Sequence, residues 1–437
     1  ASEERKVSYR QTALVTIGRI LIISGEILLF FLYVYLFRPR IFDEIRNIIL
    51  ISSLMVLMIA LTTFIIKNTG FNYFILPYAL LPIMVRVFYD SRTALFAHII
   101  TMMIIALMVD NSFRFLILQI FIGMAAVSSL KDMTQRSQLA QTAFIIFLCY
   151  TGIYLAHEFI IEGEIRKVHW LPILYFAISS TFLLFAYVLI YIFEKVFGLI
   201  SAVTLVELTN INSDLMMEFA EKAPGTFQHT LQVSNLATEA AKKIGANSLL
   251  VRTGALYHDI GKMKNPDLFV ENQMGEKNPL TDMDYEAAAR EIIKHVADGV
   301  EIAKKSHLPE QIIHFITTHH GLSKTKYFYN SYINTHPELK PNDEAFMYHG
   351  PLPDSKETAI LMMADAVEAR SRSLKNYTPA SIDEMVDSMI DSQIADGQFK
   401  NAPISFRDVE TVKDVFKLKI KNMYHSRIVY PEVKKKN

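Results

Sequence analysis

Short segments in the C-terminal half of the chain carry the histidine and aspartate side chains best suited to chemistry. A single histidine on a helix is usually a capping or core residue. Here several recur at helix-sized intervals, each flanked by apolar residues that would bury its helix. The segments are GTFQHTLQVSNLA with His229, ALYHDIGKM with His258 and Asp259, IIKHVADG with His295, FITTHHG with His319 and His320, and LMMADAVEA with Asp365. This recurrence indicates one shared site.

Imidazole and carboxylate ligands together suit a divalent metal such as Fe, Mn, Zn, Co or Ni, and the absence of thiolate argues against a soft site. The set is larger than one tetrahedral ion needs. A carboxylate can bridge two ions, and Asp259 is the natural candidate. Two ions about 3.5–4 Å apart can clamp a phosphate while an activated water attacks phosphorus. The residues therefore predict metal-dependent hydrolysis of a phosphate ester, with no Ser or Cys nucleophile required.

The elements that would position these side chains are helices. Residues 225–437 are rich in Ala, Glu, Lys, Leu and Ile and show no clear alternating strands, which predicts an all-helical domain. The charge distribution separates this domain from the preceding part of the chain. Residues 15–193 hold 21 charged side chains, whereas residues 194–437 hold 62. We interpret this asymmetry as a membrane domain followed by a soluble domain.

Seven stretches approach the roughly 20 apolar residues needed to cross about 30 Å of hydrocarbon. We expect spans at residues 15–37, 46–66, 72–89, 92–109, 113–130, 141–161 and 171–193. The third stretch is the weakest, because Pro77, Pro82 and Arg86 interrupt it. The predicted fold class is all-α: a polytopic transmembrane bundle of about seven spans over 15–193, a linker over 194–224, and the helical domain over 225–437.

Loop charges predict how the spans are oriented. With the C-terminal domain in the cytoplasm, the inner loops hold Arg38, Arg40, Arg46, Arg86, Arg92, Lys131 and Arg136, and the outer loops hold Lys67, Arg114, Arg166 and Lys167. Seven against four favours this orientation. The basic tail over 1–14 would lie outside, against the rule. We therefore expect Ala1 to mark an artificial boundary or to follow a removed outer domain.

The predicted linker over 194–224 has apolar residues at three- to five-residue steps, which is a helical stripe. Asn210, Asn212 and Ser213 are weak helix formers, so the stripe allows two helices with a break between them. One interpretation is a helix packed on the soluble domain. The other is a dimeric helix that carries an external signal to that domain, which would make the protein a homodimer.

Composition excludes several classes of protein. The net charge of +0 argues against a partner that is a nucleic-acid polymer, because such binding neutralises many phosphates. The single cysteine, Cys149, excludes disulfide scaffolds and zinc ribbons. The hydrophobic content of 51% is too high for a disordered chain. A membrane protein in contact with the lipid bilayer fits all three observations.

At this point the motifs resemble a known family. HD at 258–259 followed by IGK is similar to the HD-domain metal-dependent phosphohydrolases. With the spans before them, APGTFQHT, YHDIGKM, FVENQ, HVADGVEIAKK, HHG and MMADAVEA resemble the seven-transmembrane receptor family with an intracellular HD hydrolase domain. Members of that family are cyclic di-AMP phosphodiesterases. Similar proteins carry a large extracellular domain before most of the spans, and we expect this chain to be a form without it.

The resemblance implies a membrane-bound phosphodiesterase that hydrolyses cyclic di-AMP to pApA with a metal-activated water. It implies a location in the inner membrane of a bacterial cell, with the HD domain in the cytoplasm. It also implies a di-iron or di-manganese centre. One ion would be held by His229, His258, Asp259 and Asp365, and the other by Asp259, His295, His319 and His320.

Contacts with the substrate are less sharply predicted. Lys262 lies one helical turn after His258, where it could face a phosphate oxygen or act as a solvated or capping lysine. Tyr327 could stack on a base or pack in the core. Glu368, one turn after Asp365, could orient a metal ligand or form a surface salt bridge.

The nucleotide itself is predicted from a missing motif. The cyclic di-GMP branch of HD enzymes has Gly-Tyr-Pro after its paired histidines, whereas this chain reads HHGLSKTKYFYNS. That departure favours an adenine dinucleotide. Two alternatives stay open: a hydrolase of another nucleotide, such as cyclic di-GMP or a guanosine alarmone, and a nucleotide-binding receptor without turnover.

Overall fold

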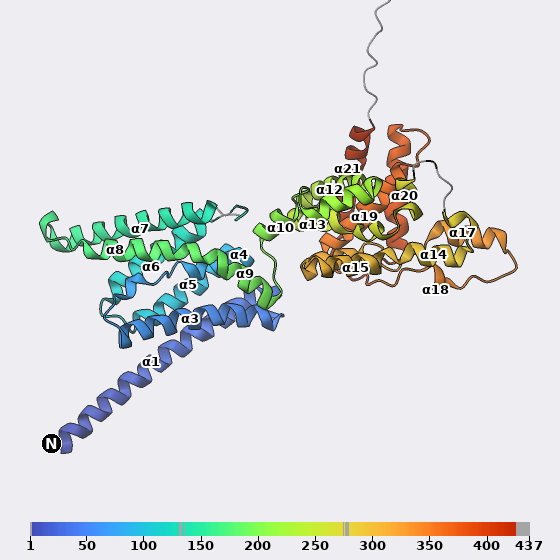
Figure 1. Ribbon diagram of the computed structural model, residues 1–437. Helices are drawn as coiled ribbons and strands as arrows, with labels where there is room; N and C mark the ends of the chain where they lie inside the picture. Colours follow the sequence, from blue (N-terminus) through green and yellow to red (C-terminus); the bar gives the residue numbers. More distant parts are fainter. Residues whose placement is uncertain (1, 131–132, 136, 274, 276–278, 425–437) are drawn as a thin grey trace, which may run out of the picture. The chain divides into compact units, whose positions relative to one another are not determined.

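The structure is a computed structural model that describes residues 2–130, 133–135, 137–273, 275 and 279–424. Within these residues the regular elements are helices, and Lys324 and Met347 form an isolated β-bridge. The predicted all-α fold class is therefore confirmed over the described residues. The chain divides into two compact units, residues 1–204 and 205–437, whose helices are labelled in Figure 1.

The first unit contains the apolar helices. They are α1 (Ser2–Phe37), α2 (Pro39–Phe42), α3 (Ile45–Asn68), α4 (Leu80–Phe88), α5 (Ser91–Ala106), α6 (Ser112–Ser129), α7 (Ser137–Glu162), α8 (Leu171–Phe182) and α9 (Ala186–Phe197). Five segments are long and apolar enough to cross a membrane: Thr12–Phe37, Ile45–Asn68, Ser112–Ser129, Ser137–Glu162 and Leu171–Phe197. Tyr73–Phe88 and Ser91–Ala106 are shorter apolar segments. These seven segments correspond to the seven predicted spans.

The third predicted span is short because of its prolines. A 3-10 turn covers Tyr73–Ile75, and α4 begins only at Leu80. Proline has no backbone N–H and clashes with the preceding helical turn, so Pro77 excludes a continuous helix across the stretch. Pro82 is tolerated because it lies in the first turn of α4, where backbone N–H groups have no helical partner.

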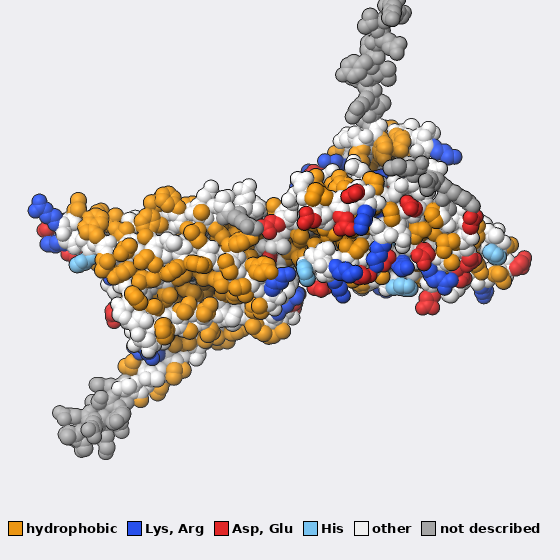
Figure 2. All heavy atoms as spheres, viewed as in Figure 1, with side chains coloured by type: hydrophobic (Ala, Val, Ile, Leu, Met, Phe, Trp, Pro, Cys, Tyr) orange, Lys and Arg blue, Asp and Glu red, His pale blue; other side chains and the backbone are white. Residues whose placement is uncertain are grey.

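The surface of the first unit is largely apolar. Only 17–33% of the five long apolar segments is buried, and Figure 2 shows hydrophobic side chains spread over their surface. A soluble protein would bury such faces, whereas a lipid bilayer solvates them. Inside the unit, rings from separate helices pack together: Tyr150 of α7 stacks on Phe176 of α8, with ring centroids 4.8 Å apart. The protein is therefore a multi-pass membrane protein.

Charged residues pair at the ends of the apolar helices. The Arg38 side chain donates from Nε to Asp90 Oδ2 at 2.7 Å, and Asp90 also caps α5 by accepting from the backbone N–H of Thr93. This pair ties the end of α1 to the start of α5. Lys131 and Arg136, which entered the predicted loop charges, lie outside the described residues.

The segment predicted as a linker contains two short helices. α9 ends at Phe197, and Gly198 follows with φ +62°, a left-handed conformation that glycine adopts without a steric penalty. Next come α10 (Ala202–Leu208) and α11 (Asp214–Lys222). The interruption between them spans 209–213, where the weak helix formers lie.

The second unit is built from helices, and several of them begin at strong capping positions. After α11 they are α12 (Pro224–Lys243), α13 (Ser248–Tyr257), α14 (Tyr285–Ile293), α15 (His295–Lys305), α16 (Glu310–Thr318), α17 (Lys326–Thr335), α18 (Asp343–Phe346), α19 (Lys356–Ser371), α20 (Pro379–Ala395) and α21 (Phe406–Met423). Ser355, Thr378 and Ser405 form capping boxes at the starts of α19, α20 and α21. The start points of these helices are thereby fixed by the sequence.

Helix α19 forms the centre of the second unit. Its residues from Thr358 to Asp365 are all buried, as expected for a helix surrounded by others. Helices α12, α13, α20 and α21 supply the remaining core, including Leu236, Val251, Val386 and Phe416. Asp365 and Glu368 are thus acidic side chains on the most enclosed helix of the unit, where a carboxylate requires partners.

Candidate metal centre

Five helices bring the predicted ligand residues to one place. His229 lies within α12, and His258 and Asp259 follow α13 directly. His295 begins α15, His319 and His320 follow α16, and Asp365 lies in the middle of α19. Although the sequence separates these residues by up to 136 positions, His229 Nε2 lies 2.9 Å from Asp365 Oδ1. The predicted set therefore forms one cluster.

The cluster has two halves of three ligands each. The His229 half consists of His229, His258 and Asp365, and the His295 half consists of His295, His319 and His320. Within each half, one ligand atom from every residue lies within 4.8 Å of the others. Nε2 of His295 and Nε2 of His319 are 3.3 Å apart. Imidazole nitrogens this close together are typical of ligands that share a cation.

Asp259 lies between the two halves and faces both. Its Oδ1 is 3.4 Å from His295 Nε2 and 3.6 Å from His319 Nε2. Its Oδ2 is 3.5 Å from His258 Nε2 and 3.8 Å from His229 Nε2. One carboxylate oxygen thus points to each half, which is the placement that a bridging ligand needs.

The donors fit two divalent ions. Asp259 Oδ1 and His258 Nε2 are buried and have no hydrogen-bond partner among the described residues. Buried polar atoms are nearly always paired, so two orphans in one cluster indicate a missing ligand. One side offers three imidazoles, the other offers two imidazoles and a carboxylate, and a shared carboxylate lies between them. This set of donors matches the preferences of Fe, Mn, Zn, Co or Ni.

The electrostatics of the His295 half favour metal binding. Burial lowers the pKa of His295 to about 4, although the nearby Asp259 carboxylate opposes that shift. Burial likewise holds the pKa of His320 well below its usual range. A neutral imidazole is the form that binds a metal. Burial alone would raise the pKa of Asp259, but Lys262 and His258 hold it well below the usual value, so this carboxylate is ionised.

His229 shows the opposite shift. Burial lowers its pKa, but hydrogen bonds to Asp365 and Glu368 outweigh burial and raise the pKa to about 10. Nε2 of His229 faces Asp365, and Nδ1 faces Glu368. A divalent ion in this half would replace the proton on Nε2.

Lys262 reaches into the cluster from the turn after Asp259. Its Nζ lies 2.7 Å from Asp259 Oδ2 and 3.0 Å from Glu271 Oε1, and it sits 4.8 Å from the centre of the Phe269 ring. Burial would lower the pKa of Lys262, but the two carboxylates raise it, so the ammonium stays charged. A fixed cation beside the bridging carboxylate is well placed to contact a phosphate oxygen.

A cavity of about 420 Å³ gives access to this cluster. Lys262, Glu271 and Arg372 share its wall with ligand residues His229, Asp259, His320 and Asp365. Three charged side chains that are not ligands therefore line the same space. The cavity therefore combines candidate metal ligands with two cations, Lys262 and Arg372, and one further carboxylate, Glu271.

Tyr327 lies outside the cluster. It is 76% exposed on α17, and its ring contacts that of Phe328. By contrast, Tyr348, which the sequence did not single out, lies against His320 with ring centroids 4.1 Å apart. Sequence reasoning gave no role to Glu271, although it lies in the FVENQ motif, and none to Arg372. The contacts of both residues with the cluster arise only through packing.

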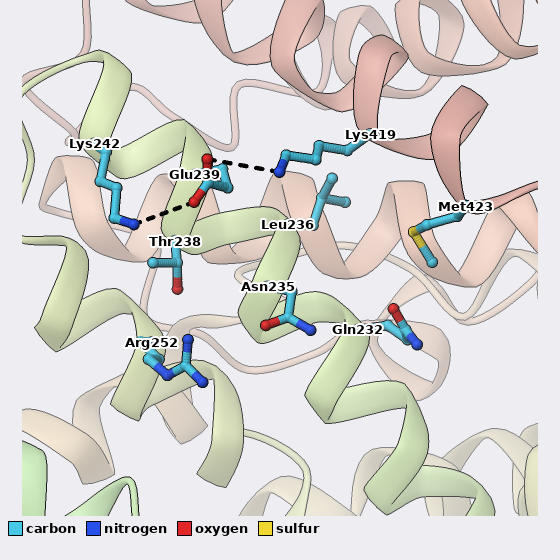
Figure 3. A pocket seen from close by; sticks show the side chains of 9 residues that line it. All are labelled: Gln232, Asn235, Leu236, Thr238, Glu239, Lys242, Arg252, Lys419 and Met423. Atoms are coloured by element: carbon cyan, nitrogen blue, oxygen red, sulfur yellow. Dashed lines mark hydrogen bonds and ion pairs between the residues drawn. The ribbon is translucent and has the colours of Figure 1, made fainter.

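A second polar hollow, of about 330 Å³, is lined in part by α12 and shares no lining residue with the cavity at the cluster (Figure 3). Its wall includes Asn235, Glu239 and Arg252, and Glu239 pairs with Lys242 at 3.2 Å and with Lys419 at 3.6 Å. Its lining contains no histidine and one carboxylate, so it does not offer the donors of the metal cluster.

Gly261 allows the helix that carries His295 to approach the bridging aspartate. A Cβ at residue 261 would lie 1.9 Å from the carbonyl oxygen of His295 and 2.5 Å from the backbone nitrogen of Gly299. Both atoms belong to the backbone of α15, which cannot move aside as a flexible side chain would. The glycine in HDIGK is therefore required for the contact between this turn and α15.

Replacing Gly261 with alanine is expected to push α15 away and to destabilise the second unit by about 1–3 kcal/mol, the usual cost of overpacking. Hydrogen exchange of amides in α15 would measure this cost. Gly152→Ala is the control, because a Cβ there would meet no atom within 4 Å. Equal protection of α15 in the G261A variant and the unmodified chain would contradict the expectation.

Comparison with known proteins agrees with both units. Residues 13–201 match the family model described as 7TM receptor with intracellular HD hydrolase, and residues 226–370 match the HD domain. Membrane helices followed by a histidine–aspartate centre thus define an HD-domain membrane protein. The chain belongs to the family of seven-transmembrane receptors with an intracellular HD hydrolase.

Two curated relatives extend across most of the chain. The cyclic-di-AMP phosphodiesterase PgpH of Listeria monocytogenes is 35% identical over 373 residues, which cover 84% of this chain and 52% of that protein. The PgpH of Bacillus subtilis is 31% identical over 406 residues, covering 90% of this chain and 56% of that protein. The chain thus spans about half the length of these relatives.

One solved structure matches half of this chain. It is the HD domain of L. monocytogenes PgpH in complex with cyclic di-AMP. It is 41% identical in sequence and covers 50% of this chain and 100% of that chain, with a TM-score of 0.47.

Proposed function

We propose that this protein is a membrane-bound phosphodiesterase that hydrolyses cyclic di-AMP to the linear dinucleotide pApA. The observation that carries this proposal is the position of Asp259, with one oxygen toward each three-ligand half of the cluster. The matching relatives from Listeria and Bacillus are named cyclic-di-AMP phosphodiesterases. The missing Gly-Tyr-Pro after His319 and His320 favours the adenine dinucleotide in addition.

The centre would hold two iron or two manganese ions. His229, His258 and Asp365 would hold one, His295, His319 and His320 the other, and Asp259 both. Such ions lower the pKa of bound water and offset the negative charge of a phosphodiester during hydrolysis. The set of imidazole and carboxylate ligands without thiolate supports iron or manganese over a soft metal.

The remaining residues of the cavity would bind and orient the substrate. Lys262 would donate hydrogen bonds from its ammonium to a phosphate oxygen, and Arg372 offers a second cation on the same wall. The Tyr348 ring restricts rotation of His320, the most exposed ligand, whose side chain is 25% exposed. These contacts would align the scissile phosphate with the water that attacks it.

The family and the loop charges support a topology in which the HD domain lies in the cytoplasm of a bacterial cell and the spans cross its inner membrane. A homodimer and control by a signal outside the membrane are further predictions from the order of the domains. Dimerisation and the external signal would both act through α10 and α11, the helices between α9 and α12.

The decisive experiment is hydrolysis by the full chain in detergent, purified without oxygen and supplied with Mn²⁺ or Fe²⁺. We expect cyclic di-AMP to yield pApA, with kcat/KM for cyclic di-GMP and a guanosine alarmone at least tenfold lower. A chain that turned over cyclic di-GMP as fast would favour another nucleotide. Tight binding of cyclic di-AMP without cleavage, in metal-loaded protein, would favour a receptor.

A further inference from the structure

Three ligand histidines anchor their second ring nitrogen on the backbone. In each case the acceptor is the carbonyl oxygen three residues earlier. The distances from Nδ1 to that oxygen are 2.8 Å from His258 to Ala255, 2.6 Å from His295 to Ile292, and 2.8 Å from His319 to Ile316. A neutral carbonyl therefore orients each of these rings.

Helix ends explain this shared arrangement. His258 and His319 directly follow α13 and α16, and His295 comes just after the end of α14. The last four carbonyls of a helix have no partner within the helix, so they are free to accept from an imidazole N–H. The three rings use carbonyl acceptors in the last turns of these helices, and the Ile292 carbonyl also accepts from the backbone N–H of Lys294.

His229 does not have this option. It is the sixth residue of α12, and the carbonyls one turn before it accept hydrogen bonds within the helix. Its Nδ1 instead contacts Glu368 Oε2, while its Nε2 lies 2.9 Å from Asp365 Oδ1. Two carboxylates from one helix, α19, thus hold both nitrogens of this ring.

Arg372 fixes the role of Glu368 as an acceptor. Glu368 is 1% exposed, and its Oε1 accepts from Arg372 Nε at 2.8 Å and lies 2.7 Å from Arg372 Nη2. A guanidinium can only donate hydrogen bonds. With its other oxygen on His229, Glu368 accepts the Nδ1 proton and leaves the Nε2 lone pair directed at the metal cluster. Glu368 is therefore a positioning residue for His229.

We propose that the two halves bind their ions with unequal strength, and that Glu368 makes the His229 half the tighter one. This inference rests on the metal centre of the proposed function and goes beyond it. A carboxylate behind a ligand histidine orients the ring and strengthens its bond to the metal more than a neutral carbonyl does. In the His295 half, two of the three histidines, His295 and His319, have backbone carbonyls in that place.

Mn²⁺ titration of the full chain in detergent, after removal of metal with a chelator, tests the proposal. Free Mn²⁺ is measured by electron paramagnetic resonance. We expect one tight and one weaker ion in the unmodified chain. Glu368→Gln should weaken the tight ion about 10–100-fold, the usual effect of losing such a partner. His320→Gln should weaken the other ion instead.

Glu301→Gln is the matched control, because Glu301 is a half-exposed carboxylate that pairs with Lys264 and Lys305 away from the cluster. It should leave both affinities unchanged. If the E368Q variant loses its helical circular-dichroism signal, the Glu368→Asp variant is titrated in its place. The affinity for the tight ion should again fall.

Two ions of equal affinity in the unmodified chain, or unchanged binding in the Glu368 variant, would overturn the inference and leave the proposed function standing. A chain that bound no Mn²⁺ and no Fe²⁺ would instead overturn both.

Discussion

Replacing Asp259 with alanine is expected to abolish phosphodiester hydrolysis while the second unit stays folded. Asp259 directs one oxygen toward each half of the cluster, so its loss would remove a ligand from each ion at once. Metal ions contribute several kcal/mol of charge stabilisation in such reactions, and about 1.4 kcal/mol is a factor of ten. We therefore expect a fall in kcat of about a thousandfold or more.

The measurement is pApA formation with saturating Mn²⁺ or Fe²⁺, together with the number of bound ions per chain. That number should fall below two. Asp259→Asn serves as a second variant that keeps the shape of the side chain. Asp354→Ala is the control, since Asp354 is exposed and pairs with His314 at 2.9 Å outside the cluster. Near-normal turnover by the D259A variant would rule out a shared bridging carboxylate.

The ligand residues could be predicted from sequence because each lies in a short segment with its own apolar flanks. His258 and Asp259 end one buried helix, and Asp365 lies within another, so local pattern alone placed them on helices. The seven apolar stretches were visible for a similar reason, since hydropathy is a property of each segment. That one oxygen of Asp259 faces one half of the cluster and the other oxygen faces the other half follows only from the three-dimensional packing.

The substrate-side residues show where local pattern fails. The sequence offers Tyr327 for stacking on a base or for core packing, and on α17 this side chain is exposed, so it does not pack in the core. Tyr348 has no comparable signal, yet the loop before Gly350 brings it against His320. The sequence leaves two roles open for Glu368, because its spacing from Asp365 is equally compatible with orienting a metal ligand and with forming a surface salt bridge. It meets His229 from another helix, 139 positions away in sequence.

Replacing Lys262 with methionine is expected to destabilise the metal-free second unit strongly. The substitution keeps the length of the side chain but removes the cation between Asp259 and Glu271. Two carboxylates, one of them 2% exposed, then lack their counter-ion. Removing one partner of a buried ion pair costs about 3–5 kcal/mol, because the remaining charge is neither solvated nor compensated.

The pH dependence of this loss has a definite sign. Burial raises the pKa of Glu271, but Lys262 outweighs burial and lowers it. A carboxylate with a lowered pKa stabilises the fold above its unfolded pKa, and that contribution fades as pH falls. In the variant without Lys262, protonation removes the uncompensated negative charge of the unpaired carboxylates. The difference in unfolding free energy between the variant and the unmodified chain should therefore narrow as pH falls from about 7 toward about 4, which is near the ordinary pKa of these groups.

Native-state hydrogen exchange of amides in the second unit, in chelator, measures the free energy directly. Lys264→Met is the matched control on the same turn. Lys264 is 37% exposed and pairs with Asp298 and Glu301, so its loss should cost no more than about 1 kcal/mol. Saturating Mn²⁺ should reduce the K262M deficit, since ions in the cluster also neutralise Asp259. Equal costs for the two lysines would show that Lys262 does not neutralise the centre, and its proposed contact with a phosphate oxygen would then lose its electrostatic basis.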